Sequence, residues 1–510
     1  MSSRTASGFR GRPDHGPFPT YGVGSGEGNS RFQCGLFMTP QSPLPPQHNG
    51  KKEARYAADT FDGKSDLSKL RRRMATATVL AAMVLVVVDA AITNIALPTI
   101  AESLHVTPGM SVGAITAYQC ALLMALFPSA ALGESIGYRK VFSGGIALFT
   151  LASVLCALSP SLNWLLAARF IQGIGGAGIM ALGVAILRSV VLPQQLGAAI
   201  GWNALAVALS SAVGPVIGAT VLSFTTWPWL FAVNLPLGVL VLLSARSLPN
   251  GVGTARRLDL LSVFLNAGGF ASLVIGAELL PTRPAMALLV FAAAALQLVA
   301  LIFREIPKKA PLIPLDLLRT RPFLISVVAS VFCFAGQTAS MVALPFYLQH
   351  ELGRDMLKVG LYMTPWPLSV AVAAAFAGRV ADHISTARLC AIGGMCLASG
   401  LGAAACWPLQ GNPAPLVPLT MLCGVGFGIF NVANNRSMFS SAPVERSGSA
   451  GGMQGTARLS GQLAGAVTMA LLFSVISADA APRIGLGIGS VLAAVAALVS
   501  TLRVTPMGSR

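Results

Sequence analysis

The sequence predicts an all-α polytopic membrane protein with fourteen transmembrane helices. Three observations lead to this prediction: the composition, a succession of long apolar runs, and the placement of basic residues between those runs. The 510 residues are 54% hydrophobic and only 10% charged, whereas about 25% of residues are charged in a typical soluble protein. Because so few charges could not cover a soluble fold of this size, most of the chain is expected to lie in a membrane.

Residues 1–73 differ from the rest of the sequence. They are rich in Gly, Pro, Ser and Arg and have no apolar periodicity, which is typical of disordered segments. We expect a basic, disordered cytoplasmic tail here, and a mis-assigned start codon is the alternative for part of it. No cleavable signal peptide is visible, because the first long apolar run begins only after Arg73.

Fourteen apolar runs follow the tail, and each is close to the ~20 residues that cross a bilayer as a helix. The predicted helices cover residues 75–98, 110–132, 141–158, 163–187, 197–222, 229–246, 259–280, 285–304, 322–348, 358–378, 388–407, 416–437, 449–476 and 484–503.

The basic residues support this count. Arginine and lysine are concentrated in every second loop, and Arg503, at the end of the last run, is counted with them. The alternate loops hold only Arg283, Arg354, Lys358 and Arg483. Since basic residues favour the cytoplasmic side, both termini are predicted to be cytoplasmic. This placement also accounts for the net charge of +17, so no nucleic-acid surface is expected.

An internal repeat divides the helices into two groups. Glu134 and Asp382 each end a predicted helix after small and apolar residues, and 248 positions separate them. A unit duplicated at this offset gives an N-terminal six-helix bundle at 74–246 and a C-terminal six-helix bundle at 322–510. Two inserted transmembrane helices and a cytoplasmic linker fill 247–321. Parallel repeats of this kind build one large class of transporters.

Two charged residues lie inside predicted spans of the first bundle. A charge at the centre of a span costs about 2.5–3.5 kcal/mol on insertion scales. Burial favours the neutral form of Asp89, so this carboxyl group is expected to take up and release a proton; the alternative is a fixed hydrogen-bond partner. Arg169 needs a partner or water, and its alternative is a packing arginine that reaches the lipid headgroups.

Glycines mark two further spans. Residues 173–178 match G-x-G-x-x-G, which is the sequence motif of a dinucleotide-binding loop. Such a loop follows a strand, but here one apolar run continues on both sides, so the glycines are expected to be spacers for a neighbouring helix. In the fifth span, small residues favour close helix packing and a Gly-Pro pair favours a bend. These residues are Gly201, Gly214, Pro215 and Gly218.

Together these features resemble the major facilitator superfamily, and in particular its fourteen-span drug:proton antiporter branch. The stretches 88–98, 132–140, 166–178 and 201–219 are similar to the family patterns D-x-T-x-V-N-x-A-L-P, G-x-L-A-D-R-x-G-R-K, R-x-x-Q-G-x-G and G-x8-G-x3-G-P-x2-G-G. The resemblance covers the chain from about residue 75 to the end and excludes the tail. It implies the major facilitator fold, with two six-helix bundles and two inserted helices.

The resemblance also implies roles for the matching residues. Asp89 and Arg169 would couple transport to protons, and the glycines and proline of the fifth span would form a gating helix; tight packing alone is the alternative for that helix. The loop after the second span would form a cytoplasmic latch, although Ser135 stands where the family has an arginine. A plain positively charged loop is the alternative. The expected latch residues are Glu134, Gly137, Arg139, Lys140 and Asp382.

Polar and aromatic residues on several spans are candidates for a substrate cavity. Aromatic faces and a few polar groups would suit apolar cations, and ordinary core packing is the alternative for each residue. The candidates are Asn94, Tyr118, Gln119, Gln172, Phe334, Gln337, Trp366, Asn431 and Asn434.

The expected function is proton-coupled export by alternating access. The substrate is expected to be amphipathic and cationic, such as a drug or toxic compound. The chain contains no G-x-x-x-x-G-K-[ST], H-E-x-x-H or G-x-S-x-G motif, so neither ATP hydrolysis nor another enzyme activity is expected. No cofactor, metal or nucleic acid is expected either. We expect a monomer in the inner or plasma membrane, with a periplasmic adaptor as a further partner. Export of a dedicated metabolite, siderophore or lipid, nutrient import, and a non-transporting receptor are the alternatives.

Overall fold

The computed structural model describes residues 68–192, 195–250, 259–307, 315–351, 356–380, 383–407, 414–443, 446–477 and 479–503. The expected tail up to residue 67 and the predicted latch residue Asp382 lie outside these ranges. Every secondary-structure element in the described ranges is a helix.

Seven α-helices form the first half of the described chain. They are α2 (Lys69–Ser103), α3 (Pro108–Ile136), α4 (Tyr138–Ala157), α5 (Leu162–Val190), α6 (Leu196–Phe224), α7 (Pro228–Ala232) and α8 (Asn234–Ser244), and a short 3-10 turn, η2 (Ala245–Ser247), follows them. Because α2 begins at Lys69, the first helix starts several residues earlier than the sequence predicts.

Two helices separate this half from the second one. They are α9 (Leu260–Leu279) and α10 (Pro284–Glu305). The second half contains α11 (Leu315–Leu318), α12 (Arg321–Glu351), α13 (Met356–Met363), α14 (Pro365–Val380), α15 (Thr386–Cys406), α16 (Leu416–Ser440), α17 (Ser447–Val475) and α18 (Ala481–Thr501).

These helices account for all fourteen predicted spans. In the described part of the chain, thirteen are long and apolar enough to cross a membrane, and Leu209–Phe224 of α6 forms a shorter apolar stretch. Two spans are each built from two consecutive helices: α7 and α8 form one with η2, and α13 and α14 form the other. The protein is therefore a multi-span, all-helical membrane protein.

Local sequence explains where several helices begin. Side chains of Ser68, Thr107, Ser161 and Asp259 accept hydrogen bonds from backbone N–H groups in the first turns of α2, α3, α5 and α9. Such caps satisfy N–H groups that have no partner inside the helix. The helices α3, α7, α8 and α10 carry proline near their starts, where its missing N–H costs no hydrogen bond.

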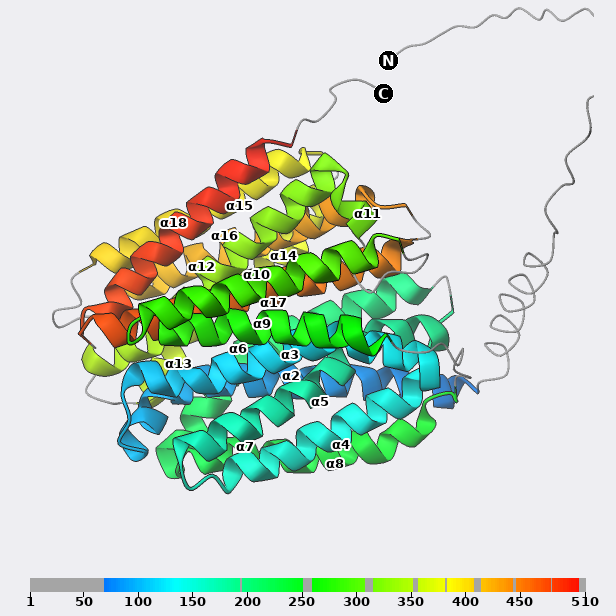
Figure 1. Cartoon of the computed structure of the whole chain (residues 1–510), viewed down its shortest axis with the longest axis horizontal. Coiled ribbons are helices and arrows are strands. Elements are labelled where there is room, and N and C mark those ends of the chain that lie inside the picture. Colours follow the sequence, from blue (N-terminus) through cyan, green and yellow to red (C-terminus); the bar gives the residue numbers. More distant parts are fainter. Residues whose placement is uncertain are drawn as a thin grey trace, which may run out of the picture. The chain divides into compact units, whose positions relative to one another are not determined.

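The helices form two groups whose cores share residues at their boundary. In Figure 1, α2–α8 make up one group and α12–α18 the other, and α9 and α10 lie beside their boundary. The groups meet where α3 packs against α17, α2 against α12, and α6 against α13 and α14. Ile95, Val112 and Ala219 of the first group lie in the core cluster of the second. Leu459 and Leu463 of the second group lie in a core cluster of the first.

Glycines allow α5 to approach two neighbours at backbone distance. A Cβ atom on Gly173 would collide with the carbonyl oxygen of Tyr118 in α3. One on Gly175 would lie 2.6 Å from the backbone nitrogen of Phe149 in α4. The helix α5 runs unbroken through all of these glycines. The G-x-G-x-x-G stretch is therefore a helical packing surface, as the flanking apolar residues predict.

Candidate functional site

A buried carboxylate joins three helices of the first half. Asp89 of α2 is fully inaccessible to solvent. Its Oδ2 atom lies 2.6 Å from Nη1 of Arg169 on α5. Its Oδ1 atom accepts hydrogen bonds from Nε2 of Gln172 at 3.0 Å and from Nδ2 of Asn234, the first residue of α8, at 2.7 Å. Both carboxylate oxygens thus have partners suited to a negative charge.

Arg169 is as deeply buried as its partner, with 1% of its surface exposed. It does not reach the headgroups, as the alternative interpretation would require. Its Nη1 also donates to Oε1 of Gln172 at 2.6 Å, and its Nε donates to the backbone oxygen of Ala114 at 3.2 Å. The guanidinium carbon lies 4.3 Å from the ring centre of Tyr118. This distance permits a cation–π interaction that adds to the stabilisation of the buried charge.

Gln172 extends the network to α4. Its Nε2 also donates to Oγ of Ser153 at 2.8 Å, and its Oε1 accepts a long contact from the Cys156 thiol at 3.7 Å. Gln172 therefore bonds to both charged residues, and its predicted place in a substrate cavity stays a prediction. We refer to Asp89, Arg169, Gln172 and Asn234 as the charge cluster.

The energetics of the charge cluster depend on both charges. Burying two ions costs several kcal/mol each, and their attraction offsets this cost only when the hydrogen bonds are complete. Loss of either charge would leave the other buried without a counter-ion, which costs about 3–5 kcal/mol. Protonation of Asp89 would have this consequence for Arg169.

A second buried arginine lies in the other half. Arg503 follows α18 and is 6% exposed, although the sequence counts it among the loop charges. Its Nη1 lies 3.0 Å from Sγ of Cys390, and its Nη2 donates to Oδ1 of Asn434. Asn434 in turn donates to the backbone oxygen of Ser326 at 3.1 Å. Asn434 therefore links Arg503 to α12, and its cavity role stays a prediction.

The remaining cavity candidates are distributed over α2, α3, α12, α14 and α16. Four buried polar atoms on α2, α3 and α14 have no hydrogen-bond partner in the described structure. Phe334 packs edge-on against Phe427, with 5.2 Å between ring centres. Gln337 and Asn431 are half-buried and bond to neighbours on their own helices. The four atoms are Oδ1 of Asn94, the hydroxyl oxygen of Tyr118, Oε1 of Gln119 and Nε1 of Trp366.

Arg458 on α17 is a charged residue that the sequence interpretation missed. It is half-buried, and its Nη2 lies 3.9 Å from Sδ of Met180 on α5. Its Nε is buried without a hydrogen-bond partner in the described chain. The rule that singled out Arg169, a charge inside an apolar run, would also have found Arg458. Asn234 and Ser153 carry no such signal, because single polar residues in apolar runs are common.

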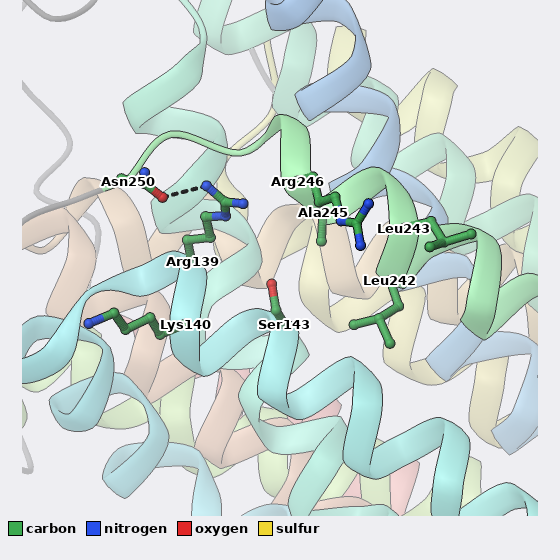
Figure 2. Close-up of a pocket in the computed structure, with 8 residues that line it drawn as sticks. All are labelled: Arg139, Lys140, Ser143, Leu242, Leu243, Ala245, Arg246 and Asn250. Atoms are coloured by element: carbon green, nitrogen blue, oxygen red, sulfur yellow. Dashed lines mark hydrogen bonds between the residues drawn. The ribbon is translucent and has the colours of Figure 1, made fainter.

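The predicted latch residues lie at one end of the first half. Glu134 is exposed near the end of α3. Gly137 joins α3 to α4 with φ of 103°, a conformation that favours glycine. Arg139 and Lys140 lie in the first turn of α4. Arg139 donates to Oδ1 of Asn250 rather than to Glu134, and both basic residues line a pocket against the end of α8 (Figure 2).

The predicted gating residues lie between the two halves. A Cβ on Gly214 would collide with Ala91 of α2, and one on Gly218 would lie 2.7 Å from Cγ2 of Ile95. A Cβ on Gly360 of α13 would lie 3.0 Å from the carbonyl oxygen of Pro215. The glycine-rich face of α6 therefore contacts the helix of Asp89 on one side and the second half on the other. Gly201 lies near the start of α6.

The described residues include no group of three or more His, Cys, Asp or Glu side chains that could hold a metal ion.

The Major Facilitator Superfamily model matches residues 79–466. The Escherichia coli K12 protein named uncharacterized transporter YebQ is 40% identical over 445 residues, which cover 86% of this chain and 97% of that protein. The riboflavin transporter RibZ of Clostridioides difficile is 27% identical over 72% of this chain and 81% of its own. The multidrug resistance protein B homolog of Mycobacterium tuberculosis is 28% identical over 68% of this chain and 66% of its own.

Proposed function

We propose that this chain, which belongs to the Major Facilitator Superfamily and is therefore a transporter rather than an enzyme, exports small amphipathic molecules in exchange for protons. The observation that carries the proposal is the charge cluster, because a buried carboxylate paired with a buried arginine links protonation to conformation. The likeness to multidrug resistance proteins supports export. We place the protein in the inner membrane with both termini in the cytoplasm.

The proton step begins with the ionised pair. A proton that reaches Asp89 removes its negative charge and turns one of its acceptor oxygens into a donor. Arg169 then lacks a counter-ion, and the amide groups of Gln172 and Asn234 compete for the remaining acceptor sites. Once Asp89 is protonated, a conformation in which water or substrate reaches Arg169 has the lower free energy, and its population increases.

The same step loosens the contact between α2, α5 and α8, which the carboxylate joins. The helix α6 can pass this change to the second half, since it packs closely against both α2 and α13. Substrate release on one side and proton release on the other then complete a cycle of alternating access. In this cycle the glycine-rich face of α6 acts as the gate.

The test is Asp89→Asn in the full chain, reconstituted into liposomes that contain a pH-sensitive dye. Ethidium and riboflavin serve as probes, the second because a relative is named as a riboflavin transporter. We expect the variant to purify as a folded protein and to lose probe-driven proton flux. The matched control is Glu102→Gln, which changes an exposed acid on the same helix and should retain the flux. Probe-driven proton flux in Asp89→Asn would refute the coupling role.

The direction of transport separates export from nutrient import. In inverted membrane vesicles that pump protons inward, an exporter accumulates the probe in the vesicle lumen. Accumulation of riboflavin but not of ethidium would favour a dedicated metabolite exporter, the second candidate that the riboflavin-transporter relative supports. Movement of either probe out of the vesicles would overturn export.

A further inference from the structure

A pocket lies between the start of α4 and the end of α8, away from the charge cluster. Its volume is about 620 Å³. Figure 2 shows the side chains of Arg139 and Ser143 on α4 opposite Arg246 on the turn after α8. The pocket is lined by Arg139, Lys140, Ser143, Leu242, Leu243, Ala245, Arg246 and Asn250.

The charge of this pocket is entirely positive. Arg139, Lys140 and Arg246 line it together with no acid. None of the three forms an ion pair with a described residue, and the only side-chain hydrogen bond that they make to one goes from Arg139 to the neutral amide of Asn250. Three cations held together without a counter-ion favour the binding of an anion.

The start of α4 adds to this preference. The helix has no side-chain cap, and its first turn contains basic residues and no acid. A helix N-terminus carries a partial positive charge, so Arg139 and Lys140 are unfavourably placed there. An anion in the pocket would offset the repulsion among the three cations and the helix end.

The rim of the pocket is apolar. Leu243 is 55% exposed and the neighbouring Leu240 is 63% exposed, and both lie on a helix that spans the membrane. A ligand with an anionic head beside a hydrocarbon chain would satisfy both parts of the site, since basic pockets between transmembrane helices suit lipid headgroups. We propose that this pocket binds the phosphate group of an anionic phospholipid, with an acyl chain along the exposed leucines of α8.

A lipid held there would join two helices that take part in the hydrogen-bond network around Asp89. The helix α4 carries Ser153 and α8 carries Asn234, both of which belong to the hydrogen-bond network around Asp89. The start of α2 is tied to the same place, because Nε of Arg71 donates to the backbone oxygen of Ser247 at 3.2 Å. Bound lipid would therefore stabilise the packing of α2, α4 and α8 that this structure shows. This inference concerns binding and does not depend on the proposed transport function.

Native mass spectrometry of the purified full chain tests the proposal. Phosphatidylglycerol is titrated against phosphatidylcholine, and adducts are counted for the parent, Lys140→Gln, Arg246→Gln and the double variant. Each removed cation should weaken phosphatidylglycerol binding about fivefold, because a basic residue near a lipid surface contributes about that factor. The matched control is Arg379→Gln, an exposed arginine on α14 outside the pocket, which should bind like the parent.

A charge-conserving variant separates binding from folding. Arg246→Lys keeps the cation and should retain binding, even if Arg246→Gln perturbs the turn after α8. Equal phosphatidylglycerol binding by the parent and the double variant would overturn the proposal. Displacement of the lipid by millimolar inorganic phosphate would instead show a site for free phosphate and would overturn the lipid assignment.

Discussion

The two halves of the protein share a packing frame but differ in their buried charges. In the first half, α4 and α5 meet at Gly145 and Gly178, where a Cβ on Gly145 would lie 3.3 Å from Cα of Gly178. In the second half, α15 and α16 meet at Gly393 and Gly426, where a Cβ on Gly393 would lie 2.7 Å from the carbonyl oxygen of Gly426. Both pairs are related by the same 248 positions that separate Glu134 from Asp382. The duplicated frame thus extends well beyond the loop motif.

The chemistry within this frame is not duplicated. At the same offset, Gln337 and Val417 correspond to Asp89 and Arg169. The buried arginine of the second half comes instead from Arg503, and its partners are an amide and a thiol. A proton can neutralise the partner of Arg169, but it cannot neutralise Asn434. The comparison teaches that the two halves share their backbone packing, whereas only the first half pairs a buried arginine with a buried carboxylate among the described residues.

The largest expected effect comes from removing one charge of the buried pair. Arg169→Met should lower the free energy of unfolding by about 3–5 kcal/mol, because Asp89 is left buried without a counter-ion. Asp89→Asn combined with Arg169→Met should recover most of this loss, since no buried charge remains. Thermal unfolding of the purified variants in detergent measures both. A single variant as stable as the parent would contradict a buried ion pair.

The next largest effect is expected from a variant that gives the buried arginine of the second half a carboxylate partner, as in the first half. Asn434→Asp places a carboxylate beside Arg503, and a charge-assisted hydrogen bond contributes about 1.5–3 kcal/mol. The added stability should be present near neutral pH and lost on acidification, as the carboxylate takes up a proton. Unfolding temperatures of the variant and the parent, compared across pH, measure the difference. The same pH dependence in both proteins would show that Arg503 does not sense the new charge.

A smaller effect tests whether the packing frames are equivalent. Gly145→Ala and Gly393→Ala each place a methyl group against a neighbouring backbone, at 2.9 Å from Gly175 O and 2.7 Å from Gly426 O. Each should destabilise the protein by about 1–3 kcal/mol through overpacking. Gly144→Ala is the control, because its Cβ would meet nothing within 4 Å. A large loss of stability in only one half would mean that the two packing frames contribute differently to the free energy of unfolding.

The sequence predicts much of this structure, because the relevant signals are local. Apolar runs predict the helices: in the described chain, thirteen of the fourteen expected spans are long and apolar enough to cross a membrane. A charge inside an apolar run identifies Asp89 and Arg169 individually. Their contact joins residues 80 positions apart, so it depends on how α2 packs against α5. The sequence shows that both helices exist but not which faces meet.

Arg503 is a residue whose burial the sequence does not predict. A basic residue at the end of a span reads as a loop charge, and only the packing of α18 against α15 and α12 decides that it is buried. Asn234 is similar: nothing in its apolar run distinguishes it until α8 is placed beside α2. Such residues become visible when the distances between helices are known.

The smallest expected effect concerns Arg458, a cation at the contact between the halves. It reaches from α17 to Met180 of α5 and has no acidic partner in the described chain. A cation held there should disfavour a cationic substrate nearby, which opposes the substrate charge that the sequence analysis expects. Arg458→Gln should therefore raise ethidium transport relative to riboflavin by about fivefold, the factor that corresponds to about 1 kcal/mol. Arg458→Lys, which keeps the charge, should leave the ratio near that of the parent. An unchanged ratio in Arg458→Gln would place the substrate path away from this contact.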